Sequence, residues 1–147
     1  MVDFTQLLSK PAFEAKKPEA LPVGDYTGVI KAYELGDNNK EKTPYVKYTI
    51  ALTEWPEDVP EAEKEGINIS KRQLSRNFFL RDKEGSDQIL WRLDEFLRSC
   101  GIDGKGRQYQ ELISEPVGLT VKVSVKQYMN RTSNEIGNDV GALVGVV

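Results

Sequence analysis

The fold depends on Ser86-Asp-Gln-Ile-Leu-Trp-Arg-Leu-Asp-Glu-Phe-Leu-Arg-Ser-Cys-Gly101. Apolar residues recur in this stretch at spacings of three and four, which predicts an α-helix with one apolar stripe. The stripe consists of Ile89, Leu90, Leu93, Phe96, Leu97 and Cys100. Ser86 or Asp87 is expected to cap the helix, and Gly101 to end it in a left-handed conformation. Because a lone amphipathic helix must bury its stripe, we expect the flanking segments to form a small β-sheet that closes over it.

Composition limits the classes of protein to consider. The chain has 147 residues, 39% hydrophobic content and a formal net charge of −3, which fits one domain without a generally basic surface. A single cysteine excludes an internal disulfide framework and fits a reducing compartment. Histidine is absent, which removes the usual general base, the Ser-His and Cys-His pairs and most zinc sites. We therefore expect no enzyme, no metal and no cofactor.

Two acidic pairs are candidate metal ligands for a nuclease, Asp94 with Glu95 and Glu61 with Glu63. Charged helix faces and acidic loops are more typical of solvated surface, so we assign them no site.

No apolar run approaches the roughly 18 residues of a membrane span, and the N-terminus lacks a signal-peptide core. The expectation is a soluble cytoplasmic protein with no membrane partner.

Five segments have strand character, at residues 24–35, 43–53, 67–81, 118–128 and about 135–144. Alternation is cleanest in the second, where one set of side chains is expected to face inward: Val46, Tyr48, Ile50 and Leu52. In the fourth segment the inward set is Leu119, Val121, Val123 and Val125. Gly28 is expected to permit a bulge. Between the second and third strands, residues 54–66 form an acidic, proline-containing excursion.

The third segment does not alternate regularly. If Leu74, Phe78 and Leu80 face inward, Arg72 and Arg76 share their side of the strand. We therefore expect a bulge or a strand rim lifted from the core, with the register left open.

The element order is strand, strand, strand, helix, strand, strand. This order predicts a mainly β protein with a five-stranded OB-fold-like Greek-key barrel and one helix between strands three and four. Another small barrel or an α+β sandwich with the same order is the alternative. Residues 24–147 are assigned to this domain. Residues 1–23 are expected to form an arm, with a short helix around Phe4, Leu7 and Leu8 and then a linker rich in proline and lysine.

OB-folds bind oligonucleotides across the face of strands two and three, between the loops joining strands one and two and strands four and five. Cationic and aromatic residues of this chain fall on these segments, where cations follow phosphates and rings accept unstacked bases. The candidate nucleic-acid-binding residues are Lys40, Lys42, Tyr45, Lys47, Lys71, Arg72, Arg76, Phe79, Lys122, Lys126, Tyr128 and Arg131. Each alone also has a structural explanation, as edge protection or cross-strand packing. Trp91 is expected to pack beside the helix stripe and Trp55 begins an acidic loop, so neither is included.

The chain also resembles a family of small phage-encoded proteins that is grouped with phage single-stranded-DNA-binding proteins. Five motifs carry the resemblance: Leu7-Leu8-Ser9-Lys10-Pro11-Ala12, Leu21-Pro22-Val23-Gly24-Asp25-Tyr26, Thr43-Pro44-Tyr45-Val46, Leu90-Trp91-Arg92-Leu93-Asp94-Glu95-Phe96-Leu97 and Cys100-Gly101-Ile102-Asp103. The resemblance implies an OB-fold protein of phage DNA replication or recombination, in the host cytoplasm, with proteins of those pathways as further partners. Many single-strand binders end in an acidic tail, whereas this sequence ends in the apolar run Gly141–Val147. Either a tail lies beyond this sequence or partners are recruited by another route.

Two functions therefore remain. The leading hypothesis is sequence-tolerant binding of single-stranded DNA without catalysis. The alternative is a protein-interaction or virion-structural module that assembles, with itself or with other proteins, through the arm and the apolar C-terminus. DNA or RNA preference, site size and oligomeric state are left open by the sequence.

Overall fold

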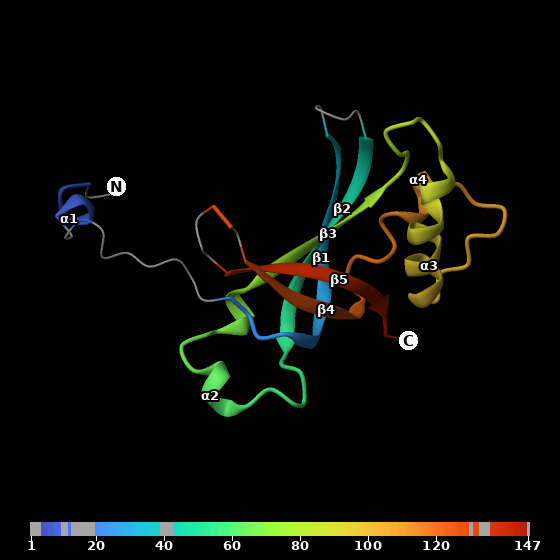
Figure 1. Ribbon diagram of the computed structural model, residues 1–147. Helices are drawn as coiled ribbons and strands as arrows, with labels where there is room; N and C mark the ends of the chain where they lie inside the picture. The colour runs from blue at the N-terminus through green and yellow to red at the C-terminus, as the bar shows by residue number, and fades with distance from the viewer. Residues whose placement is uncertain are drawn as a thin grey trace.

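β1 (Gly24–Asn38) is the central strand of a five-stranded antiparallel sheet in the order β3-β2-β1-β4-β5. The computed structural model describes residues 4–9, 12, 20–38, 43–129, 131–132 and 136–146. The other strands and the helical segments are β2 (Thr43–Glu54), β3 (Gln73–Phe79), β4 (Thr120–Met129), β5 (Ile136–Gly145), α1 (Phe4–Leu8), α2 (Glu61–Lys64), η1 (Ile69–Lys71), η2 (Gln88–Leu90), α3 (Trp91–Ser99) and α4 (Tyr109–Leu112). The mainly β class and the predicted element order are confirmed (Figure 1).

β1 pairs with β4 through its first residues and with β2 along most of its length. The register with β2 shifts between Thr27 and Gly28 and again between Ile30 and Ala32. A Cβ at Gly28 would lie 2.8 Å from the carbonyl oxygen of Ala51, so the partner strand approaches too closely for a side chain there. The predicted bulge at Gly28 is confirmed.

The two edge strands of the sheet, β3 and β5, lie close to each other. Among the described residues no backbone ladder joins them; instead, side chains of both strands line a hollow of about 260 Å³. We call this space the seam and define it by Ser75, Arg76, Asn77, Phe79, Asp139 and Val140. The sheet is therefore open, and its two edge strands approach each other at the seam without pairing there.

The core lies between the curled sheet and α3, which Figure 1 shows beside one end of the strands. The inward set predicted for β2 is confirmed, with Val46, Tyr48 and Ile50 fully buried and Leu52 2% exposed. In β4 the three valines of the predicted set are fully buried, but the prediction for Leu119 is wrong, because its side chain is 36% exposed. Leu119 lies in the turn before β4, where its backbone N–H donates to the carbonyl of Pro116. It therefore does not follow the alternation of the strand.

The predicted helix is present over residues 88–99, with its first turn as the 3-10 helix η2. Leu93, Phe96, Leu97 and Cys100 are buried, and Ile89 and Leu90 are partly buried. The hydroxyl of Ser86 accepts a bond from the N–H of Gln88, and Gly101 ends the helix at a φ of 77°. The prediction that Trp91 packs is wrong: it begins α3 with a side chain that is 53% exposed.

Aromatic rings fix α3 to the sheet. The ring of Phe96 stacks on Phe78 of β3, with centroids 5.1 Å apart, and lies 5.2 Å from the ring of Tyr48 of β2. Full burial of such a side chain stabilises a fold by roughly 1.5–3 kcal/mol. This cluster holds α3 against the inward side of β3.

The segment predicted as a strand over residues 67–81 is irregular at its start, where the 3-10 helix η1 precedes β3. The expected bulge is not present in the described pairing, because β3 pairs with β2 over Gln73–Phe79 without a register shift. η1 interrupts the segment, and the side chain of Asn68 accepts a bond from the N–H of Ser70 at its start. In β3 Phe78 is buried and Leu74 partly buried on the side that Arg76 shares, since Arg76 lies opposite the buried Tyr48. An arginine therefore occupies an inward position of β3.

Before β1, Leu21 is fully buried, and its N–H donates to the side-chain oxygen of Asn138 on β5 at 2.7 Å. The packed region thus begins ahead of Gly24.

α1 forms where the short helix was predicted, and its three apolar side chains, Phe4, Leu7 and Leu8, are exposed. Most of the predicted linker lies outside the described residues. No helix in the described part of the chain is long and apolar enough to cross a membrane.

Candidate nucleic-acid interface

The side of β2 and β3 that faces away from the core carries partly exposed residues in register. Tyr45 lies opposite Phe79, Lys47 opposite Asn77 and Thr49 opposite Ser75. Cross-strand partners point to the same side of a sheet, so these side chains form one continuous surface. We call it the β2–β3 outer face, defined by Tyr45, Lys47, Thr49, Ser75, Asn77 and Phe79.

Two aromatic rings lie at one end of the β2–β3 outer face. The rings of Tyr45 and Phe79 meet edge to face, with centroids 6.0 Å apart and an interplanar angle of 74°. The Tyr45 ring covers Gly36 of β1, where a Cβ would lie 2.5 Å from it. Glycine therefore lets the ring lie flat against the backbone, and both rings stay partly exposed.

Lys47 supplies the positive charge of this face. Its ammonium lies 3.9 Å from the carboxylate of Glu34 on β1, and its side chain is 36% exposed. Exposed pairs of this kind contribute roughly 0–1 kcal/mol, so the lysine remains available to another anion. Tyr45, Lys47 and Phe79 are the predicted site residues that the structure places on one surface.

Of four further candidates, two lie outside the described residues and two lie on β4 or just beyond it. Lys40 and Lys42 fall in the undescribed loop between β1 and β2. Arg131 is exposed beyond β4, and Tyr128, 54% exposed, covers Gly137 much as Tyr45 covers Gly36. Of the two that are described, neither Tyr128 nor Arg131 belongs to the β2–β3 outer face.

Lys71 and Arg72 lie at the opposite end of β3 from Phe79. The carbonyl of Arg72 accepts a bond from the N–H of Leu52 at 3.3 Å, whereas Phe79 pairs with Tyr45 seven residues earlier on β2. At about 3.3 Å per strand residue, this separation is roughly 20 Å. Lys71 and Arg72 therefore belong to another part of the surface.

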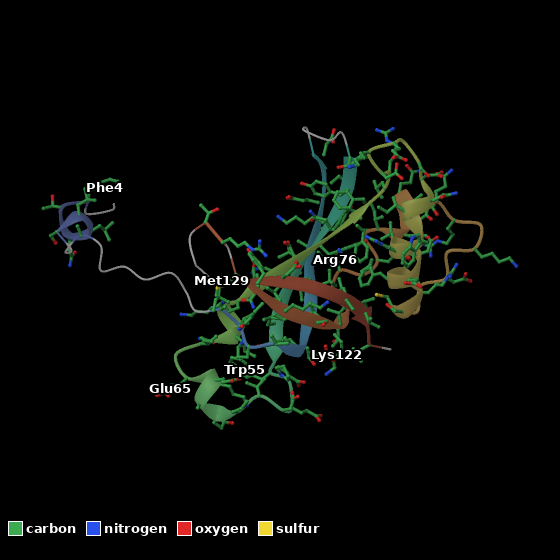
Figure 2. The ribbon with its side chains drawn as sticks, in the orientation of Figure 1. Phe4, Trp55, Glu65, Arg76, Lys122 and Met129 are labelled. Atoms are coloured by element: carbon green, nitrogen blue, oxygen red, sulfur yellow. The ribbon has the colours of Figure 1, made fainter. Side chains whose placement is uncertain are left out.

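Lys122 and Lys126 of β4 lie on a separate face. They line a hollow of about 640 Å³ together with the acidic side chains of Asp25, Glu57 and Asp58. Figure 2 shows Lys122 on β4, away from Arg76. Because these acids offset the lysines and no residue of β2 or β3 lines the hollow, these lysines do not extend the β2–β3 outer face.

Arg76 occupies the seam rather than the outer face. Its guanidinium lies 5.0 Å from the ring of Phe78, and one terminal nitrogen donates to the carbonyl of Asn77. Within the described part of the chain, its buried Nε has no hydrogen-bond acceptor. Burial lowers the pKa of Arg76; nearby Arg92 lowers it further, and Asp139 opposes the shift.

Sequence reasoning missed Trp91 and Arg92, which follow one another at the start of α3. The Arg92 guanidinium lies 5.4 Å from the centroid of the indole. The sequence does contain a feature that could have indicated them: Trp91 lies at the flank of the apolar stripe and is followed at once by the cationic Arg92. By contrast, Trp55 lies 5.7 Å from the ring of Tyr26 and is partly buried, which agrees with leaving it out of the site.

Two other kinds of site, a metal site and a reactive cysteine, are not indicated by the described side chains. The described residues contain no group of three or more acidic or cysteine side chains placed to hold a metal ion. Cys100 is buried, and burial raises the pKa of its thiol, which disfavours a reactive thiolate.

Compared with known proteins, the sequence matches no family model and no curated protein. The resemblance to phage proteins therefore stays a prediction.

Proposed function

We propose that the chain is an OB-fold protein that binds single-stranded DNA with little sequence preference, without catalysis, in phage DNA replication or recombination. The sheet order, the near approach of β3 and β5 and the helix between β3 and β4 support a partly open Greek-key barrel. In such a barrel, ligands lie across strands two and three, which correspond to β2 and β3 here.

The observation that carries the proposal is the Tyr45–Phe79 pair beside Lys47 on that face. Stacking of a base on a protein ring contributes roughly 1–3 kcal/mol and tolerates any base. Lys47 supplies a charge for the phosphate between neighbouring bases. Because the net charge is −3, attraction to DNA must come from such local groups.

Fluorescence anisotropy with a labelled oligo-dT at two salt concentrations tests this function. Tyr45→Ala is expected to weaken binding about 5- to 100-fold through lost stacking. Lys47→Ala should reduce the slope of log affinity against log salt by about 1. The matched control is Lys122→Ala with Lys126→Ala, on the other face, which should bind nearly as the wild type does. No binding by the wild type, or equal binding by Tyr45→Ala, would contradict the proposal.

The alternative function, assembly through the arm and the C-terminus, is favoured by one observation. α1 exposes three large apolar side chains, with Phe4 68%, Leu7 51% and Leu8 80% exposed. Light scattering over a range of protein concentrations tests it. A mass that grows with concentration and falls back in Leu8→Ser would support assembly; a constant mass would contradict it.

A further inference from the structure

A second aromatic and cationic site lies where α3 meets the two edge strands. A hollow of about 230 Å³ opens there between α3, β3 and β5. We call it the Trp91 hollow and define it by Arg76, Phe78, Trp91, Arg92, Glu95 and Leu143. It contains none of the outer-face residues.

Its chemistry resembles that of the outer face. Trp91 presents an indole that is 53% exposed, although the apolar residues that follow it on the buried side of α3 are covered. Arg76 and Arg92 line the same space together with Glu95, so the cations outnumber the acid there. A planar ring and a remaining positive charge suit a ligand that has both a flat base and an anionic phosphate.

The seam connects this site to the β2–β3 outer face. Arg76 lines both the seam and the Trp91 hollow, while Ser75, Asn77 and Phe79 line the seam and also belong to the outer face. In Figure 2, Arg76 lies between the sheet and α3. A single strand of DNA that follows the seam from Phe79 therefore comes to the hollow that Trp91 lines. Within the seam, Asp139 faces Arg76, so Arg92 is the arginine left for the phosphate.

We propose that Trp91 and Arg92 form a second contact for the bound single strand, which crosses the seam from the Tyr45–Phe79 pair to α3. This inference rests on the proposed function and specifies the path of the ligand. Trp91 stacks on one base, and Arg92 binds the adjoining phosphate. The footprint of the strand thus extends beyond strands two and three onto the helix.

The test uses the full chain and an oligo-dT of about 16 nucleotides, the upper end of the site size of one OB-fold. Trp91→Ala is expected to weaken binding about 5- to 100-fold, and Trp91→Phe, which keeps a ring, to restore most of the affinity. DNA should quench the wild-type tryptophan fluorescence, and most of this quenching should be lost in Trp91→Phe. Thermal unfolding of each variant checks that the fold is retained.

Arg92→Gln should reduce the salt slope by about 1. Arg98→Gln is the matched control, because Arg98 lies on the same helix and lines a different hollow. If the wild type binds and Tyr45→Ala weakens binding while Trp91→Ala and Arg92→Gln do not, this inference alone is wrong. If the wild type does not bind at all, the proposed function is wrong as well.

Discussion

The hydroxyl of Tyr48 on β2 donates a hydrogen bond of 2.7 Å to the backbone carbonyl of Ile113, the residue that follows α4. Both groups are buried, and burial raises the pKa of the tyrosine. The bond joins the middle of the sheet to the segment between α3 and β4. It holds the middle of a connection whose end, at Gly118 and Leu119, hydrogen-bonds to Ile30 of β1.

Tyr48→Phe should destabilise the protein by roughly 1–3 kcal/mol, because it leaves the buried Ile113 carbonyl without a donor. Urea unfolding followed by circular dichroism measures the change. Tyr33→Phe is the control, since Tyr33 is 39% exposed and its loss should change stability by less than about 0.5 kcal/mol. Equal midpoints for the two variants would show that the bond adds nothing.

Gly145→Ala should separate the end of β5 from α3. A Cβ there would lie 2.6 Å from the Cα of Cys100 and 2.7 Å from the carbonyl oxygen of Ser99, and backbone cannot move aside. We expect a loss of roughly 1–3 kcal/mol in urea unfolding. At Gly141 the nearest atom is the flexible Cε of Lys126 at 3.1 Å, so Gly141→Ala should be nearly neutral. A neutral Gly145→Ala would contradict this packing.

Gly36→Ala should weaken DNA binding without unfolding the chain. The new methyl group would meet the Tyr45 ring, which can swing away and so leave the β2–β3 outer face. Anisotropy with oligo-dT and a thermal melt measure the two effects. Gly137→Ala displaces the Tyr128 ring in the same way and serves as the control. Affinity lost equally in both variants would show that Tyr45 has no special role.

Stability should fall as the pH rises from 10 to 12. Tyr109 donates to the carboxylate of Asp94 at 2.6 Å, and this bond, together with burial, raises its pKa from 10 to about 12. The folded state therefore holds a proton that the unfolded state releases above pH 10, so the stabilisation is present below pH 10 and lost toward pH 12. Burial raises the pKa of Tyr26 to about 12 as well.

Urea midpoints measured across this pH range check the effect. Tyr109→Phe cannot form the bond, so it should be less stable than the wild type below pH 10 and lose less stability above it. Parallel pH profiles for the two proteins would contradict the role of the bond.

Much of the fold followed from local patterns. The alternation of β2, the apolar stripe of α3 and the glycine at its end each depend on nearby residues, and the structure confirms them. The prediction for Leu119 was wrong because Leu119 directly follows a turn that ends at Gly118, which has a φ of 91°, and its N–H donates within that turn although its carbonyl accepts from Ile30 of β1. The sequence left the register of this strand open; the structure places Arg76 on the inward side, in a seam that depends on β5, about sixty residues away in the sequence.

The candidate site was predicted less completely. Tyr45, Lys47 and Phe79 share a surface because β2 and β3 pair in register, which alternation anticipates. Lys122 and Lys126 were grouped with them by charge alone, yet acids of β1 and the loop after β2 surround these lysines. Trp91 was missed because a tryptophan beside an apolar stripe usually packs, and only the arrangement of α3 against β3 and β5 leaves it exposed.

Photocrosslinking with an oligonucleotide that carries 5-iodouracil, followed by mass spectrometry of the peptides, tests the central claim most directly. We expect crosslinks at Tyr45 and Phe79 on the β2–β3 outer face, together with Trp91 at the far end of the proposed path. Crosslinks confined to the β4 face around Lys122 and Lys126, or no crosslinks above those of an unrelated acidic protein, would contradict it.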